Sequence, residues 1–184
     1  GDTFAGKGWL LEALDQYQNA VRLAPENVGY HRQVGTTLRE LGEYDQAIKA
    51  LEEAVGVDPE EPRVHYELGR TYICLGREYE AVAEYRKAAE LAAEEPVYHL
   101  HLAEALRDVG EVDEAIDALY KAIELDPEDA RAHDRLGRLL EEQGDYESAL
   151  EAYREAAAIE PDHAGYLRQI GSVLCELEDY EQAT

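Results

Sequence analysis

The chain has 184 residues, of which 42 are acidic and 17 are basic, so its formal net charge is −25. Such a surface repels nucleic-acid phosphates and anionic membranes, which excludes both as expected partners. No stretch is apolar enough to span a bilayer, and Cys74 and Cys175 are expected to be free thiols in a reducing, cytoplasmic compartment.

A small residue recurs every 34 residues along the whole chain. The residues in register are Gly1, Gly35, Gly69, Ala103, Gly137 and Gly171, and an alanine follows each of them twelve residues later. A fixed period of this length is typical of a solenoid, in which each unit buries its apolar face by stacking on the next. We therefore expect a single array made of a partial repeat 1–27, full repeats 28–61, 62–95, 96–129 and 130–163, and a partial repeat 164–184.

Residues 1–27 open at repeat position 8, inside the first helix of a repeat, which we call helix A. Repeat 28–61 shows the complete pattern, with apolar and small residues at helical spacing on both sides of Gly42. Gly42 is a natural end for helix A, and Asp58-Pro59 ends the second helix, helix B, because proline cannot continue a helix. Each full repeat is thus predicted to be two antiparallel helices.

The later repeats keep this register with small departures. In repeat 62–95, Ala93 stands where proline is expected, so its helix B is predicted to run longer before Pro96 begins the next helix. The last partial repeat, 164–184, ends at repeat position 21, inside a helix B. Small residues such as Gly35, Ala47 and Ala54 are predicted to let neighbouring helix backbones approach closely.

The pattern resembles the tetratricopeptide repeat over the whole chain. One repeat carries Leu68-Gly69, Tyr72, Gly76, Ala81, Tyr85 and Ala88, and another carries Leu136-Gly137, Gly144, Tyr146, Ala149, Tyr153, Ala156 and Pro161. The resemblance implies an all-α, right-handed α-solenoid of stacked helix-turn-helix repeats. It also implies a protein–protein interaction scaffold that binds a protein or peptide segment.

Motifs for catalysis, cofactors and metals are missing from the sequence. It contains no glycine-rich phosphate loop, nucleophile elbow or His-Glu-x-x-His pattern, so we predict no enzyme, no catalytic residue and no cofactor. His31, His65, His99 and His133 share repeat position 4. Adjacent A helices lie about 8–10 Å apart or more, whereas ligand nitrogens lie about 2 Å from a shared ion. These histidines are therefore interpreted as a hydrogen-bonded ladder, and no metal site is predicted.

The helix A stripe opposite the apolar face is rich in arginine. In the tetratricopeptide family this stripe lines the inner groove where peptides bind. Here it contains Arg32, Arg63, Arg70, Arg131, Arg135, Arg138 and Arg168. Only Glu67, Glu104 and Asp134 oppose them in charge on the same stripe. Because arginine favours bidentate contacts with carboxylates, we predict a concave groove that binds an extended or helical acidic segment.

Ion pairing within the helices is the alternative explanation for the arginine stripe. The candidate pairs are Arg63–Glu67, Arg131–Asp134 and Arg138–Glu142. Arg32 and Arg168 have no acidic residue three or four positions away, so they are the first candidates to contact a partner. Arg70 and Arg135 follow them.

Two apolar residues near the start of the chain suggest an alternative function. Trp9 and Leu11 occupy repeat positions that carry mainly charged residues elsewhere, so we expect both to be exposed. Tryptophan is enriched at binding hot spots, which favours a structural protein that assembles with copies of itself into a filament or larger oligomer. Residues upstream of this sequence could instead cover both side chains. The period does not continue from residue 184 to residue 1 of another copy, so such assembly would use stacked ends or lateral contacts.

Overall fold

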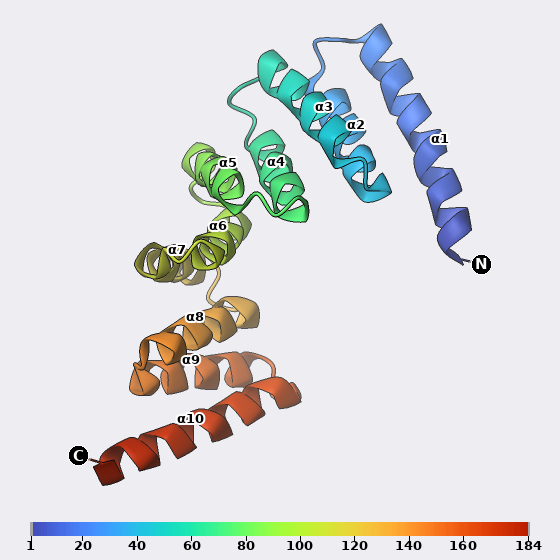
Figure 1. Ribbon diagram of the computed structural model, residues 1–184. Helices are drawn as coiled ribbons and strands as arrows, with labels where there is room; N and C mark the ends of the chain where they lie inside the picture. The colour runs from blue at the N-terminus through green and yellow to red at the C-terminus, as the bar shows by residue number, and fades with distance from the viewer. Residues whose placement is uncertain (1, 184) are drawn as a thin grey trace. The chain divides into compact units, whose positions relative to one another are not determined.

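The computed structural model describes residues 2–183, including the side chains of residues 7–178. Within this range there are ten α-helices and no strand, which confirms the predicted all-α repeat solenoid (Figure 1). The helices are α1 (Asp2–Leu23), α2 (Val28–Leu41), α3 (Tyr44–Val57), α4 (Pro62–Cys74), α5 (Glu78–Leu91), α6 (Pro96–Asp108), α7 (Val112–Leu125), α8 (Ala130–Gln143), α9 (Tyr146–Ile159) and α10 (Ala164–Ala183). Over the described residues, none of these helices is both long and apolar enough to cross a membrane.

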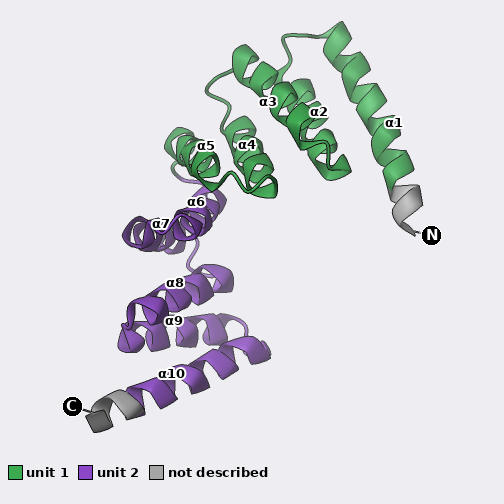
Figure 2. Ribbon diagram, in the orientation of Figure 1, with its two compact units in different colours: residues 1–93 green, residues 94–184 purple. Residues whose placement is uncertain are grey.

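The chain divides into two compact units, Gly1–Ala93 (unit 1) and Glu94–Thr184 (unit 2), as Figure 2 shows. Unit 1 contains α1 to α5, and unit 2 contains α6 to α10. In each unit, an even-numbered A helix packs extensively on the B helix that follows it, as α4 does on α5 and α8 on α9. B helices also pack on the next A helix, as α3 does on α4 and α7 on α8.

The turns between A and B helices depend on glycine. Gly42, Gly76, Gly110 and Gly144 have φ angles of 84°, 66°, 84° and 81°. Side chains disfavour this left-handed region, so glycine is the residue that ends helix A here at least cost. The N–H of Gly42 donates to the Arg39 carbonyl and the N–H of Glu43 to the Leu38 carbonyl, which satisfies two of the last carbonyls of α2.

Close helix packing depends on a second glycine, at repeat position 8. A Cβ atom added to Gly35 would lie 2.5 Å from the Leu51 side chain. The same addition at Gly137 would place Cβ 2.7 Å from the Tyr153 ring. Such distances are shorter than van der Waals contact, so a side chain would push helix A away from helix B. The predicted role is thus confirmed for Gly35.

The terminal partial repeats differ from the prediction, because each forms one continuous helix. Helix α1 continues through Gly8 and α10 continues through Glu178, where the full repeats have the turn glycine. At position 178, glutamate replaces the glycine that would allow the left-handed turn.

The predicted extension of helix B in repeat 62–95 is also wrong. Helix α5 ends at Leu91, at the same repeat position as α3, α7 and α9. Pro96 is the first residue of α6 and disfavours helical geometry at the residue before it. The chain must therefore leave the helical conformation before Pro96 even though Ala93 replaces proline.

Candidate functional site: arginines of the A helices

The seven arginines of the predicted groove are divided between the two units. Unit 1 has Arg32 on α2 and Arg63 and Arg70 on α4. Unit 2 has Arg131, Arg135 and Arg138 on α8 and Arg168 on α10. Each unit thus carries its own set of guanidinium groups.

In unit 1, Glu67 on α4 lies between two arginines. Its Oε2 accepts a hydrogen bond of 3.2 Å from Nη2 of Arg39 on α2, and both side chains are about nine-tenths buried. Its Oε1 lies 3.6 Å from Nη1 of Arg70. The Arg70 guanidinium also lies 5.6 Å from the centre of the Tyr66 ring, at cation–π distance. Glu67 therefore contacts both Arg39 and Arg70, and the sequence-based pair Arg63–Glu67 does not form.

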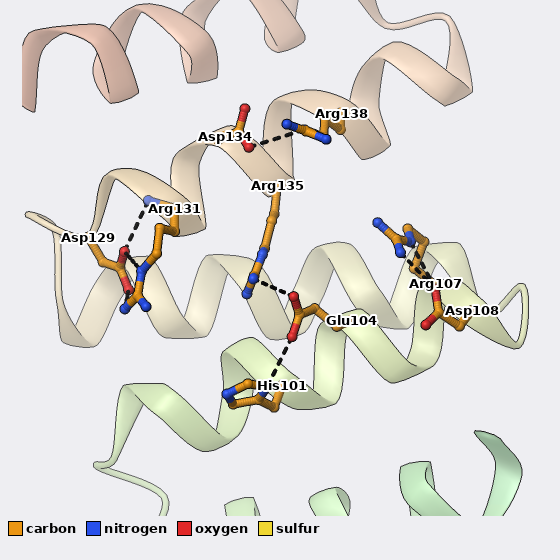
Figure 3. A network of polar contacts seen from close by, with 9 residues as sticks. All are labelled: His101, Glu104, Arg107, Asp108, Asp129, Arg131, Asp134, Arg135 and Arg138. Carbon is orange, nitrogen blue, oxygen red and sulfur yellow. Dashed lines mark hydrogen bonds and ion pairs between the residues drawn. The ribbon is translucent and has the colours of Figure 1, made fainter. Parts of the chain in front are cut away.

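In unit 2, Glu104 on α6 is the centre of a similar cluster (Figure 3). Its carboxylate accepts a hydrogen bond of 3.0 Å from Nδ1 of His101 and forms an ion pair with Arg135 of α8. Burial alone would raise the pKa of Glu104, but the His101 hydrogen bond and the positive charge of Arg135 outweigh it and lower the pKa. Arg135 is thus held against α6 by a charged carboxylate.

The other two arginines of α8 are also paired within their own helix region. Arg131 donates from Nε and Nη2 to the two carboxylate oxygens of Asp129, at 2.9 and 2.8 Å. Asp129 also caps α8 by accepting from the backbone N–H of Arg131, and these hydrogen bonds lower its pKa. Nε of Arg138 lies 3.1 Å from Oδ2 of Asp134, which forms an ion pair within α8. The pairs Arg131–Asp134 and Arg138–Glu142 suggested by spacing are replaced by these.

Three arginines remain without a carboxylate partner among the described side chains: Arg32, Arg63 and Arg168. Arg168 lines a groove of about 470 Å³ in unit 2, between α8, α9 and α10. The other lining residues are Arg138, Glu141, Glu142, Tyr153, Gln169 and Ser172. The Tyr153 hydroxyl donates to Glu141 at 2.7 Å, and burial together with this bond raises the pKa of Tyr153. Arg168 is thus the free cation of this groove within the part of the chain that the structure describes.

The two predicted self-association residues lie on α1. Trp9 is 72% exposed and Leu11 is 57% exposed. Their exposure agrees with the expectation from repeat position.

The histidines of repeat position 4 bind backbone carbonyl groups. Nε2 of His31 lies 2.8 Å from the Pro25 carbonyl oxygen, and His65 and His133 make the same contact with Pro59 and Pro127 at 3.0 Å. Each of these histidines connects the start of an A helix to the turn that precedes it. Within the described residues, no three His, Cys, Asp or Glu side chains are grouped to hold a metal ion.

His65 has an acceptor at each ring nitrogen. Nδ1 lies 2.7 Å from Oε2 of Glu84 on α5, while Nε2 faces Pro59. Only the protonated ring can donate to both acceptors. The hydrogen bond to Glu84 is the main cause of the raised pKa of His65, opposed by burial and by the charge of Lys87.

We expect His65 to stabilise unit 1 more strongly in mild acid than in mild base. Because its folded pKa is raised, this stabilisation is fully present below the unfolded pKa of about 6.5 and is lost as pH rises through the folded pKa. The difference in unfolding free energy between wild type and His65→Gln should therefore shrink as the pH rises from about 6.5 through the raised pKa of His65. Urea unfolding followed by circular dichroism measures it, and a difference independent of pH would contradict the charged pair.

The ion pairs between helices were missed from sequence. Arg39–Glu67 joins residues 28 positions apart, and Arg135–Glu104 joins neighbouring A helices in the same manner. The sequence signal for these ion pairs was a pair of oppositely charged residues separated by nearly one period of 34 residues. The sequence-based alternative considered only partners within one helix.

Known proteins and protein families share the repeat pattern of this chain. The model of one protein family, the cilia and flagella-associated protein 70 C-terminal domain, matches residues 1–182. No curated protein sequence matches the chain.

Several crystal structures share the fold. MamA is 26% identical, with a TM-score of 0.78 over 90% of this chain and 97% of its own. YrrB, a TPR protein with an unusual peptide-binding site, is 24% identical, with a TM-score of 0.75 over 91% of this chain and 86% of its own. TTC0263, a thermophilic TPR protein of Thermus thermophilus, is 20% identical, with a TM-score of 0.67 over 95% of both chains. At the identities of YrrB and TTC0263, the likeness shows the fold alone.

Proposed function

Because the chain belongs to the tetratricopeptide-repeat family of the cilia and flagella-associated protein 70 C-terminal domain, we propose that it recruits an acidic protein segment through its A-helix arginines. The repeat fold makes it a protein–protein interaction scaffold, and this fold is typically non-enzymatic. The fold shared with YrrB, which has a peptide-binding site, is compatible with a peptide partner. The two exposed, free cysteines support a cytoplasmic location.

The observation that carries the proposal is the unpaired state of Arg168 beside a groove. In a chain of net charge −25, a guanidinium near many carboxylates would be expected to be neutralised. Arg168 has no such partner among the described side chains, and Gln169 and Ser172 add hydrogen-bonding groups to the same groove. A carboxylate side chain of a bound segment would complete this set through charge-assisted hydrogen bonds. Arg32 occupies the equivalent repeat position in unit 1 and offers a second contact.

Arg168→Glu is expected to weaken binding of an acidic peptide about tenfold or more, since a charge-assisted hydrogen bond contributes about 1.5–3 kcal/mol. Arg32→Glu should have the same direction of effect. The measurement is fluorescence polarisation with a labelled peptide of glutamates and leucines, compared with its lysine counterpart. Affinity should fall as salt rises, because exposed charges are screened.

Arg154→Glu on α9 is the matched control, because it makes the same change of charge at an exposed site of unit 2 outside the A helices. It should alter affinity much less than Arg168→Glu. If Arg154→Glu and Arg168→Glu weakened peptide binding equally, net charge alone would explain the effect. A stronger affinity for the lysine peptide would contradict an acidic partner.

Self-assembly is the second candidate function, favoured by the exposure of Trp9 and Leu11. It would make the chain a structural protein whose partner is another copy. The two functions use different surfaces, because Trp9 and Leu11 lie on α1 and the arginines lie on A helices.

A further inference from the structure

A second groove of unit 2 lies on the side of α8 that faces away from the arginines of that helix. It has a volume of about 430 Å³ and is lined by residues of α7, α8 and α9. Both B helices, α7 and α9, pack on α8 (Figure 1). The α8 residues that line the groove are His133, Leu136 and Leu140, which at about 100° per residue lie opposite the three arginines of α8. The B-helix groove, as we call it, is therefore separate from the arginine sites.

The B-helix groove has an apolar floor and an aromatic wall. Leu136, Leu140 and Ala152 are buried at its floor, and Ile123 is half-buried. Tyr120 of α7 is 52% exposed beside them. Its repeat position, 25, carries charged residues in the other full repeats: Glu52, Arg86 and Arg154. The groove can thus bury an apolar side chain of a partner against a tyrosine ring.

The unpaired polar groups on two sides of this floor accept hydrogen bonds. Nε2 of His133 lies 3.0 Å from the Pro127 carbonyl oxygen, and because a carbonyl only accepts, Nε2 carries the proton. In the neutral ring Nδ1 is then an acceptor, and it has no partner among the described residues. The carboxylates of Glu151 and Glu155 on α9 also line the groove and are likewise unpaired in the described part of the chain. These three groups can bind a donor.

Unit 1 satisfies the equivalent histidine with its own side chains. Nδ1 of His65 lies 2.7 Å from Glu84, at repeat position 23, and the charge of Lys87, at position 26, also acts on His65. In unit 2 these two positions carry Ala152 and Glu155. An alanine therefore replaces the carboxylate that would fill the groove, and a carboxylate replaces the cation. Unit 2 leaves to a partner the donors that unit 1 supplies itself.

The helices on both sides of the groove are strongly acidic. Together α7 and α9 carry seven acidic and two basic residues. Of the two basic residues, Lys121 pairs with Glu124 at 2.9 Å. Arg154 lies exposed at the groove rim and is the remaining cation of the two helices. This surface attracts a cationic partner and repels an acidic one.

We propose that the B-helix groove binds a segment of another protein in which an apolar side chain is flanked by lysine or arginine. The apolar side chain would lie against Tyr120 and Ala152, and the cations would bind the carboxylates of α9 and donate to Nδ1 of His133. Lysine and arginine side chains carry only donors, which matches the unpaired acceptors. Because the arginine sites of α8 lie on its opposite side, one chain would hold an acidic and a basic partner together.

The probe is a labelled peptide with two leucines one helical turn apart and two lysines beside them, in a background of alanine and glutamine. Its binding to the full chain is measured by fluorescence polarisation. Tyr120→Glu should weaken binding about tenfold, as loss of an aromatic contact at the centre of an interface does. The change adds a negative charge, so general attraction of the peptide would predict tighter binding. Glu52 shows that helix B accepts glutamate at this repeat position.

Tyr79→Glu is the matched control, because Tyr79 is a 71% exposed tyrosine on the B helix α5 of unit 1. It makes the same change of charge outside the groove and should not weaken binding. Arg154→Gln should strengthen binding, because it removes the cation at the rim. Arg168→Glu should not weaken binding of this peptide, although it weakens binding of the acidic one, so the two proposals can fail separately.

Ala152→Glu tests the comparison with unit 1. It supplies the carboxylate that Glu84 provides to His65, so it should fill the groove, occupy Nδ1 of His133 and weaken peptide binding despite the added negative charge. Ala152 is 6% exposed, so circular dichroism must show that the variant is folded. Tyr120→Glu, at an exposed site, tests the groove independently of that result.

Three results would overturn the proposal. One is equal binding of the probe and of a version with glutamine in place of both lysines, because the partner would then need no cation. Another is equal affinity of Tyr120→Glu and Tyr79→Glu for the probe, which would place the peptide elsewhere on the acidic surface. The third is self-association of the wild type that Tyr120→Glu abolishes in sedimentation, which would make a second copy the occupant.

Discussion

Tyr153→Ala is expected to destabilise the fold by about 3–5 kcal/mol, the range for truncating a large buried aromatic side chain. Tyr153 is 0% exposed and is the largest of the fully buried side chains among the described residues. Its ring lies against Gly137 of α8, so that a Cβ atom at Gly137 would be 2.7 Å from it. Alanine would leave a cavity there and would also remove the hydroxyl that donates to Glu141 at 2.7 Å.

Tyr153→Phe separates these two contributions. It keeps the ring over Gly137 and removes only the hydrogen bond to Glu141, so a loss of about 1–1.5 kcal/mol is expected. Urea unfolding followed by circular dichroism measures both variants on the same scale. If Tyr153→Phe were as destabilising as Tyr153→Ala, the hydrogen bond and not the packing would hold α8 on α9.

Arg39→Met is expected to destabilise unit 1 by about 3 kcal/mol or more, because removing one partner of a buried ion pair leaves an uncompensated charge. Glu67 would keep only Arg70, at 3.6 Å and on the exposed side of its carboxylate. Methionine retains most of the apolar stem of arginine, so the change isolates the charge. Thermal unfolding of the full chain should show the loss as a lower midpoint.

Two further variants test the cause. Arg70 is the more exposed partner of Glu67, with 39% of its side chain exposed. Arg70→Met should therefore lower the unfolding free energy much less than Arg39→Met. The double variant Arg39→Met with Glu67→Leu removes both buried charges and should recover most of the stability. An Arg39→Met variant as stable as Arg70→Met would show that the buried carboxylate is already neutral or solvated.

The repeat positions of small residues predicted most of the fold. Gly42, Gly110 and their equivalents determine where the A helices end. Gly35 and Gly137 determine how closely the B helices approach the A helices. Both effects are local and steric, so the sequence alone reveals them. The ends of the array were not predictable in the same way. Glycine permits a bend at Gly8 but does not impose it, and α1 is continuous there.

The pairing of the arginines with carboxylates was not predictable from the sequence. Helical periodicity places Arg135 and Arg168 at the same side of their A helices. It does not reveal that Arg135 pairs with Glu104 while Arg168 has no carboxylate partner among the described side chains. An arginine side chain is long enough to reach a neighbouring helix. Its partner is therefore set by packing between repeats, as with Glu104, and local spacing along one helix does not determine it.

The contact of position-8 glycine with the position-24 side chain has a consequence for how such a chain can change length. Loss of a whole period of 34 residues brings a small residue, glycine or alanine, and its covering side chain back into opposition, so duplication or deletion of complete repeats keeps the helices in register. Loss of a single residue within a helix rotates all later side chains by about 100° and turns Gly137 or its equivalents away from the facing helix. Viable length changes in this chain are therefore quantised in whole repeats, and large indels are better tolerated than small ones.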